Sequence, residues 1–178
     1  QRFPAIACQP DCDFVVTWQS SDGASDGIFG QRFSEDGDSL GGEFPVNTFT
    51  VSTQEAPSAG MDSSGNFVIV WQSFAGDGSG FGISGRRFAA NGTPLGGEFV
   101  VNTTTAGNQM YPSVAMGLGG EFVVAWQSPG QDGGLDGIFA RRYDASGNPL
   151  SSEIPINTYT TDRQINASVA IEASGGFV

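Results

Sequence analysis

The side chains best suited to chemistry are carboxylates in three loops rich in Asp and Gly. Each loop follows a tryptophan, and short carboxylates between glycines can wrap a hard cation such as Ca²⁺, which takes several oxygen ligands. We therefore predict calcium as the one candidate cofactor. The alternative is a solvated turn in which these residues satisfy the backbone, and none of the loops follows the EF-hand pattern. The candidate ligands are Asp22, Asp26, Asp77, Asp132 and Asp136.

The only two cysteines, Cys8 and Cys12, flank a short turn in the segment Cys8-Gln-Pro-Asp-Cys12. A pair confined to one hairpin favours a local disulfide, and a disulfide favours an oxidising compartment. The competing interpretation is a redox or metal pair. Two thiols without histidine make a poor zinc site.

Composition narrows the classes of function. The 178 residues include no His, seven basic residues that are all Arg, 19 acidic residues and a formal net charge of −12. Without His, the commonest catalytic base and every His-dependent triad are missing, so we predict that the chain is not an enzyme. The acidic charge would repel the phosphates of nucleic acids, which excludes them as partners.

The chain repeats itself. The segment Phe14–Ser20 recurs as Phe67–Ser73 and Phe122–Ser128, which places the tryptophans 53 and 55 residues apart. A second block recurs after each of these segments, as Gly27–Phe33, Gly82–Phe88 and Gly137–Tyr143. The repeats cover residues 1–53, 54–108 and 109–163, and a fourth repeat begins with its first strand at 164–178.

Each repeat predicts four β-strands. In the second repeat they are Pro57–Met61, Asn66–Ser73, Gly82–Phe88 and Glu98–Asn102, separated by turn residues. The second strand is apolar on both faces, so both sides of its sheet must be covered. We predict an all-β fold of β-propeller-type blades, each a four-stranded antiparallel sheet, in preference to a β-solenoid or a string of sandwiches. Propellers close with about 4–8 blades, so three blades and a fragment do not form a closed ring. Either further blades lie outside this chain, or several copies assemble, or the blades form an open arc.

Several residue types recur once in every repeat, which indicates structural positions rather than a catalytic centre. We expect the tryptophans to pack inside, and each recurring Arg to pair across strands with a Glu. An anionic-sugar site is the functional alternative for that pair. We expect the recurring Gln and Asn to hydrogen-bond the backbone of the neighbouring sheet. These positions are Trp18, Trp71 and Trp126; Arg32, Arg87 and Arg142; Glu43, Glu98 and Glu153; Gln19, Gln72 and Gln127; Asn47, Asn102 and Asn157; and Gln54, Gln109 and Gln164.

The third repeat carries the segments Gly120-Glu-Phe-Val-Val-Ala-Trp-Gln-Ser128 and Gly137-Ile-Phe-Ala-Arg-Arg-Tyr-Asp144, followed by Pro149-Leu150. With Val101-Asn-Thr-Thr104 after the second repeat, this pattern resembles repeats of large secreted bacterial proteins described as calcium-binding or type I secretion-target repeat proteins. The resemblance covers essentially the whole chain. It implies an extracellular or cell-surface location and a larger parent protein, although the glycine-rich calcium nonapeptide is missing.

Together these features predict a non-enzymatic, extracellular structural or adhesive module that self-associates or belongs to a larger surface protein or fibre. Its expected partners are copies of itself, flanking blades of a longer parent chain, or surface glycans. No apolar run is long enough for a membrane span, which needs about 18 residues. The alternative is a carbohydrate-binding, lectin-like propeller, which requires exposed Trp or Tyr beside Asp or Asn in equivalent loops.

Overall fold

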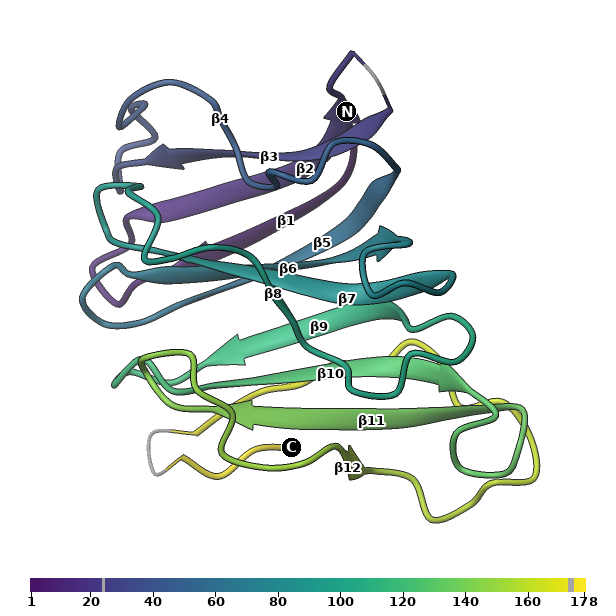
Figure 1. The fold of residues 1–178 in the computed structure, drawn as a ribbon. Helices are drawn as coiled ribbons and strands as arrows, with labels where there is room; N and C mark the ends of the chain where they lie inside the picture. Colours follow the sequence, from purple (N-terminus) through teal and green to yellow (C-terminus); the bar gives the residue numbers. More distant parts are fainter. Residues whose placement is uncertain (24, 173–174) are drawn as a thin grey trace.

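The computed structural model describes residues 1–23, 25–172 and 175–178, and in this part of the chain twelve strands form three separate four-stranded antiparallel sheets (Figure 1). The first sheet contains β1 (Arg2–Cys8), β2 (Phe14–Ser21), β3 (Asp26–Phe33) and β4 (Phe44–Pro45). The second contains β5 (Gln54–Met61), β6 (Phe67–Phe74), β7 (Phe81–Phe88) and β8 (Phe99–Val100). The third contains β9 (Met110–Met116), β10 (Phe122–Pro129), β11 (Asp136–Tyr143) and β12 (Ile154–Pro155).

Neighbouring strands in each sheet are also neighbours in sequence, so every sheet is a meander. The second and third strands pair without interruption, as in the run from Phe67↔Phe88 to Phe74↔Phe81. The fourth strand is a two-residue pairing near the middle of the third. The predicted all-β fold with four-stranded antiparallel sheets is confirmed. No helix among the described residues is long and apolar enough to cross a membrane.

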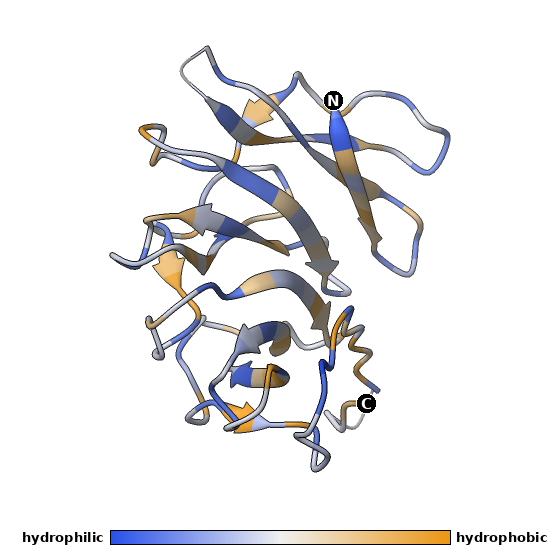
Figure 2. Ribbon diagram, turned by 90° about the vertical axis from the view of Figure 1, so that its right-hand side faces the viewer, coloured by the Kyte–Doolittle hydropathy of each residue, from blue (hydrophilic) through white to orange (hydrophobic). Residues whose placement is uncertain are grey.

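The sheets are stacked face to face, and their apolar faces form the core (Figures 1 and 2). Phe67, Ile69 and Trp71 of β6 pack against the first sheet, whereas Val68 and Val70 pack against the third. All five side chains are completely buried. The second strand is therefore covered on both sides, because its alternate residues point into different interfaces.

The two ends of the stack differ from its middle. Ile6, on the outer face of the first sheet, is 64% exposed, and Trp18 is only partly buried. At the other end, residues 164–172 and 175–178 lie against the third sheet, where Val169 and Phe177 contact its apolar face. The described sheets form a stack that does not close on itself. Residues 173–174 of the predicted fourth repeat and Ala24 of the first loop lie outside the described residues.

A buried asparagine ties each sheet to the next. Asn102 Oδ1 accepts a hydrogen bond from Ile83 N at 2.7 Å, and its Nδ2 donates to Gln109 Oε1 at 3.2 Å and to Asp77 Oδ2 at 2.7 Å. Gln109 directly precedes β9, so this one side chain connects the second sheet, its loop and the start of the third. Instead of the neighbouring sheet's backbone, as predicted, the asparagine contacts the glutamine side chain there. Equivalent contacts join Asn47 to Ile28 and Gln54, and Asn157 to Ile138, Asp132 and Gln164.

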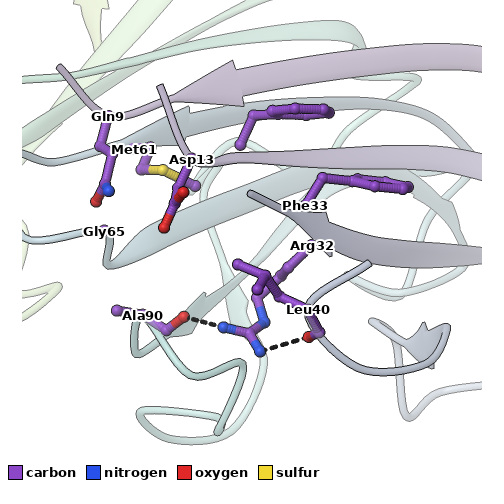
Figure 3. Close-up of a pocket in the computed structure, with 9 residues that line it drawn as sticks. Gln9, Asp13, Arg32, Phe33, Leu40, Met61, Gly65 and Ala90 are labelled. Atoms are coloured by element: carbon purple, nitrogen blue, oxygen red, sulfur yellow. Dashed lines mark hydrogen bonds between the residues drawn. The ribbon is translucent and has the colours of Figure 1, made fainter. Parts of the chain in front are cut away.

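The recurring arginines link the sheets at their outer turns. Arg32 donates to the carbonyl of Leu40 in its own sheet at 2.6 Å and to the carbonyl of Ala90 in the second sheet (Figure 3). Arg87 reaches Ser146 O of the third sheet at 2.5 Å and also donates to Ala145 O. The guanidinium of Arg142 lies 6.0 Å from the ring centroid of Phe177. Arg32 and Arg87 therefore bridge two sheets, and in the described part of the chain none of the three arginines forms the predicted cross-strand pair with glutamate.

The glutamates fasten the sheets in the opposite direction. Glu98 accepts from the backbone N–H groups of Thr48 and Phe49 and, at 2.7 Å, from the Thr48 hydroxyl. Glu153 accepts from Thr103 N at 2.5 Å and Thr104 N at 3.0 Å. Each of these two carboxylates therefore accepts hydrogen bonds from backbone N–H groups of the loop that leaves the preceding sheet.

Replacing the buried asparagine should destabilise the fold in proportion to its burial. Asn102→Ala leaves a buried N–H, a carboxylate and an amide without their partner, so we expect it to lower the free energy of unfolding by about 2–4 kcal/mol. Asn157 makes equivalent contacts in a more exposed place, so Asn157→Ala should cost about 1 kcal/mol. Urea unfolding of both variants tests this order, and equal losses would contradict it.

Candidate functional site

The first strands of successive sheets, which we call the inner strands, lie next to one another along one side of the stack. β1 contacts β5, and β5 contacts β9. Between them, Ser58 Oγ accepts from Val114 N at 3.1 Å, and Ser113 Oγ accepts from Val169 N at 3.3 Å. The repeats therefore bring equivalent positions together along a common axis.

Each inner strand is interrupted by a bulge at the same place. The pairing register shifts between Arg2 and Ala5 in β1 and between Glu55 and Ser58 in β5, and a shift of the same kind occurs between β9 and β10. Bulges redirect side chains, and a left-handed conformation at a residue other than glycine is strained. At this position of the four repeats the left-handed residues are Phe3 (φ 48°), Ala56 (φ 51°), Tyr111 (φ 55°) and Asn166 (φ 59°).

The bulges surround a shallow, open hollow of about 340 Å³, which we call the axial hollow. Phe3 and Tyr111 line it together with Ala56, Ser58 and Ser113. Phe3 is 57% exposed and Tyr111 48% exposed, although large aromatic side chains are usually covered. The strained backbone thus holds two aromatic rings toward solvent at one place.

One carboxylate is connected to the backbone of Tyr111 through a buried glutamine. Glu55 immediately precedes the left-handed Ala56, and its Oε1 accepts from Gln72 Nε2 at 2.7 Å. Gln72 is 3% exposed, and its Oε1 accepts from Tyr111 N at 2.8 Å. Arg2, Met110 and Ile165 occupy the position of Glu55 in the other repeats.

The arrangement suits a polyhydroxylated ligand. Exposed aromatic rings offer flat apolar surfaces and, in tyrosine, a polar hydroxyl. A carboxylate accepts hydrogen bonds from hydroxyl groups and is the side chain used in pairs to cleave glycosidic bonds.

The loop aspartates predicted as calcium ligands are engaged in hydrogen bonds within their own loops. Asp77 Oδ1 accepts from Ser79 N at 3.0 Å, and Asp132 Oδ1 accepts from Gly134 N at 3.0 Å. Asp22 Oδ1 accepts from Ser25 N at 2.8 Å. The hydrogen bond from Asn157, followed by that from Gly134, lowers the pKa of Asp132 below its ordinary value of 3.8.

The other two predicted ligands, Asp26 and Asp136, contact residues outside their loops or at the loop ends. Asp26 accepts from Gln19 Nε2 at 2.8 Å, and Asp136 forms an ion pair with Arg163 at 3.1 Å. Across residues 1–23, 25–172 and 175–178, no three His, Cys, Asp or Glu side chains converge as a metal site would require. In the structure these carboxylates accept hydrogen bonds from backbone and amide donors, and the calcium site stays a prediction.

The other predicted sites lie away from the axial hollow or inside the core. Cys8 and Cys12 are both exposed and carry free thiols, so the predicted disulfide is absent from the structure. Trp71 and Trp126 are completely buried, which prevents either indole from serving as a sugar platform. Glu43, the counterpart of Glu98 and Glu153, is exposed.

Sequence analysis missed Phe3, Glu55, Tyr111 and Asn166. A usable signal was present, because Pro4, Pro57 and Pro112 follow the left-handed residues in three repeats. Proline cannot donate to a sheet ladder and within sheets is largely confined to edges and bulges. It therefore marked the bulges, but not which side chains would gather there.

No protein-family model matches the sequence, and no curated protein matches it. Solved structures do resemble the fold. An endo-arabinase from Bacteroides thetaiotaomicron aligns with 99% of this chain and 69% of its own at 16% identity and a TM-score of 0.58. An exo-1,5-α-L-arabinanase from a bovine ruminal metagenomic library aligns with 87% of this chain and 56% of its own at 13% identity and a TM-score of 0.51.

A third neighbour comes from the GH130 family of mannoside phosphorylases, which contains glycoside hydrolases that target β-1,2-mannosidic linkages in Candida mannan. It aligns with 89% of this chain and 49% of its own at 11% identity and a TM-score of 0.52. At these identities the likeness shows the fold, which is of the propeller type found in glycosidases. This chain spans about half to two thirds of the length of these neighbours.

These neighbours contradict the prediction of a non-enzymatic structural or adhesive module. They are mostly carbohydrate-processing enzymes, and they favour the alternative prediction, carbohydrate binding. The argument against an enzyme relied on the missing histidine. It was wrong because glycoside hydrolysis typically uses two carboxyl groups and needs no imidazole.

Acid should remove the contribution of Glu153 to stability. Burial opposes the ionisation of Glu153, but hydrogen bonds from Thr103, Thr104 and Gln131 outweigh it and hold its pKa below the ordinary value of 4.5. A carboxylate with a lowered folded pKa stabilises the fold above its ordinary value, and this contribution disappears as the pH falls through the folded pKa.

We therefore expect Glu153→Gln to lower the free energy of unfolding by about 1 kcal/mol at pH 7 and by much less near pH 3. Glu43→Gln is the matched control, because Glu43 is exposed. Urea titrations at the two pH values measure the difference, and a loss for Glu153→Gln that does not change with pH would exclude this explanation.

Proposed function

We propose that the three sheets are consecutive blades of a carbohydrate-active β-propeller, covering residues 1–53, 54–108 and 109–163, with a fourth blade beginning at 164–178. The face-to-face stacking of the sheets and the adjacency of their inner strands support this arrangement. Propeller blades pack in this way around a common axis.

In this proposal the axial hollow binds carbohydrate. One observation carries it: strained bulges hold the exposed rings of Phe3 and Tyr111 around a hollow, and a buried glutamine links the backbone of Tyr111 to Glu55. Backbone strain of this kind persists where the surrounding structure enforces it and clusters at functional sites. The rings would lie against the apolar faces of a sugar, and Glu55 would accept hydrogen bonds from its hydroxyl groups.

Linear α-1,5-arabino-oligosaccharides are the first ligands to test, because two structural neighbours are an endo-arabinase and an exo-1,5-α-L-arabinanase. We expect Tyr111→Ala to weaken binding about tenfold or more, since it removes one stacking surface. Tyr159→Ala is the matched control, because Tyr159 is 60% exposed but lies outside the lining of the hollow. Isothermal titration calorimetry gives both dissociation constants.

Equal affinities of the two tyrosine variants would place the site elsewhere. A glycan array containing arabinan and β-1,2-mannan fragments extends the test to other sugars. If the wild-type chain binds no glycan on the array or in the calorimeter, the proposed function is wrong.

Glu55 is the candidate catalytic carboxylate. Glu55→Gln keeps the shape of the side chain but removes its charge, so hydrolysis of arabinan or mannan fragments should fall at least a hundredfold while binding changes less. Reducing-sugar release measures this, with Glu121→Gln, on a turn between β9 and β10, as the control. Hydrolysis that survives Glu55→Gln would assign the reaction to other carboxylates.

A further inference from the structure

Gln72 of β6 connects two inner strands through one buried carboxamide. Its Nε2 donates to Glu55 Oε1 in β5 at 2.7 Å, and its Oε1 accepts from the backbone N–H of Tyr111 in β9 at 2.8 Å. Only 3% of the residue is exposed. The same group therefore holds a carboxylate of the second sheet and the strained backbone of the third.

The direction of this carboxamide is determined by its partners. A backbone N–H can only donate, so the amide oxygen must face Tyr111 and the NH₂ group must face Glu55. If the carboxamide were reversed, its NH₂ group would face the N–H donor of Tyr111, and its oxygen would face the acceptor oxygen of Glu55. The hydrogen bond to the carboxylate therefore has one stable orientation.

The equivalent glutamines lack this link. Gln19 donates to Asp26, the first residue of β3, at 2.8 Å, and Gln127 pairs in register with Met110 rather than with a carboxylate. Among the described residues, the Oε1 atoms of Gln19 and Gln127 are buried and have no hydrogen-bond partner. The glutamine belongs to the repeat, but only at position 72 does it hold an inner-strand carboxylate and the backbone of the next inner strand.

We propose that Gln72 is a positioning residue of the axial hollow, holding the Glu55 carboxylate and the Tyr111 backbone in one fixed relation. The consequence of this inference rests on the proposed function. A sugar ligand would contact the ring of Tyr111 and the carboxylate of Glu55 while these two groups stay at a constant distance from each other. Neither residue alone determines that separation, because they belong to different sheets.

Two variants separate the two hydrogen bonds. Gln72→Leu removes both, whereas Gln72→Glu keeps an acceptor for Tyr111 but opposes a second carboxylate to Glu55. Gln127→Leu is the matched control, a buried glutamine at the same strand position that faces methionine. Urea unfolding of all three variants establishes that each is folded under the conditions of the assay.

The first measurement needs no ligand. Amide hydrogen exchange at Tyr111, followed by NMR, should accelerate about tenfold or more in Gln72→Leu and stay near the wild-type rate in Gln72→Glu and Gln127→Leu. An unchanged rate in Gln72→Leu would overturn the link between the strands.

The second measurement is the dissociation constant for the arabino-oligosaccharide, or for the glycan that the array identifies. We expect it to rise about tenfold in both Gln72→Leu and Gln72→Glu and to stay constant in Gln127→Leu. Wild-type affinity in Gln72→Glu would overturn the positioning role while leaving carbohydrate binding intact. If no glycan binds the wild-type chain but the exchange pattern holds, the proposed function fails and the link through Gln72 stands.

Discussion

The structure depends on one constraint, which is that the sheets are apolar on both faces. Val68 and Val70 alternate with Phe67, Ile69 and Trp71 along a single strand, and all are fully buried. A sheet of this kind is most stable when both faces are covered, as in the second sheet. Stacking therefore stabilises every repeat, and the outer face of the first sheet remains exposed because no further sheet covers it among the described residues.

Hydrophobic faces bring the sheets together, but they do not determine how one sheet lies on the next. Directional polar contacts do this at three levels of each interface. A buried asparagine meets the glutamine that opens the next sheet, an arginine reaches the next sheet's outer turn, and a glutamate satisfies the loop of the preceding sheet. Because unpaired buried polar groups are costly, a shifted arrangement would lose several of these contacts together.

The same stacking creates the candidate site. Each repeat supplies one bulge, and alone a bulge presents one strained residue. Once the inner strands are adjacent, residues more than fifty positions apart share a hollow, and the repeats can differ there without disturbing the core. Glu55, Phe3 and Tyr111 occupy such positions. A fold built from similar repeats can thus carry a single site, because the side chains on its inner strands differ from repeat to repeat.

The sequence alone determined the all-β class, the repeat and the four strands of each sheet, because these follow from local alternation and turn chemistry around Trp71 and its equivalents. It could not identify the partners of Arg87 or Glu153, since both reach other sheets, nor the roles of Glu55 and Tyr111. The missing histidine led to the wrong prediction about enzymatic function, because glycoside hydrolysis needs no imidazole. Only the tertiary structure brought the residues of the candidate site together, because they become neighbours through packing between sheets, which leaves no local pattern in the sequence.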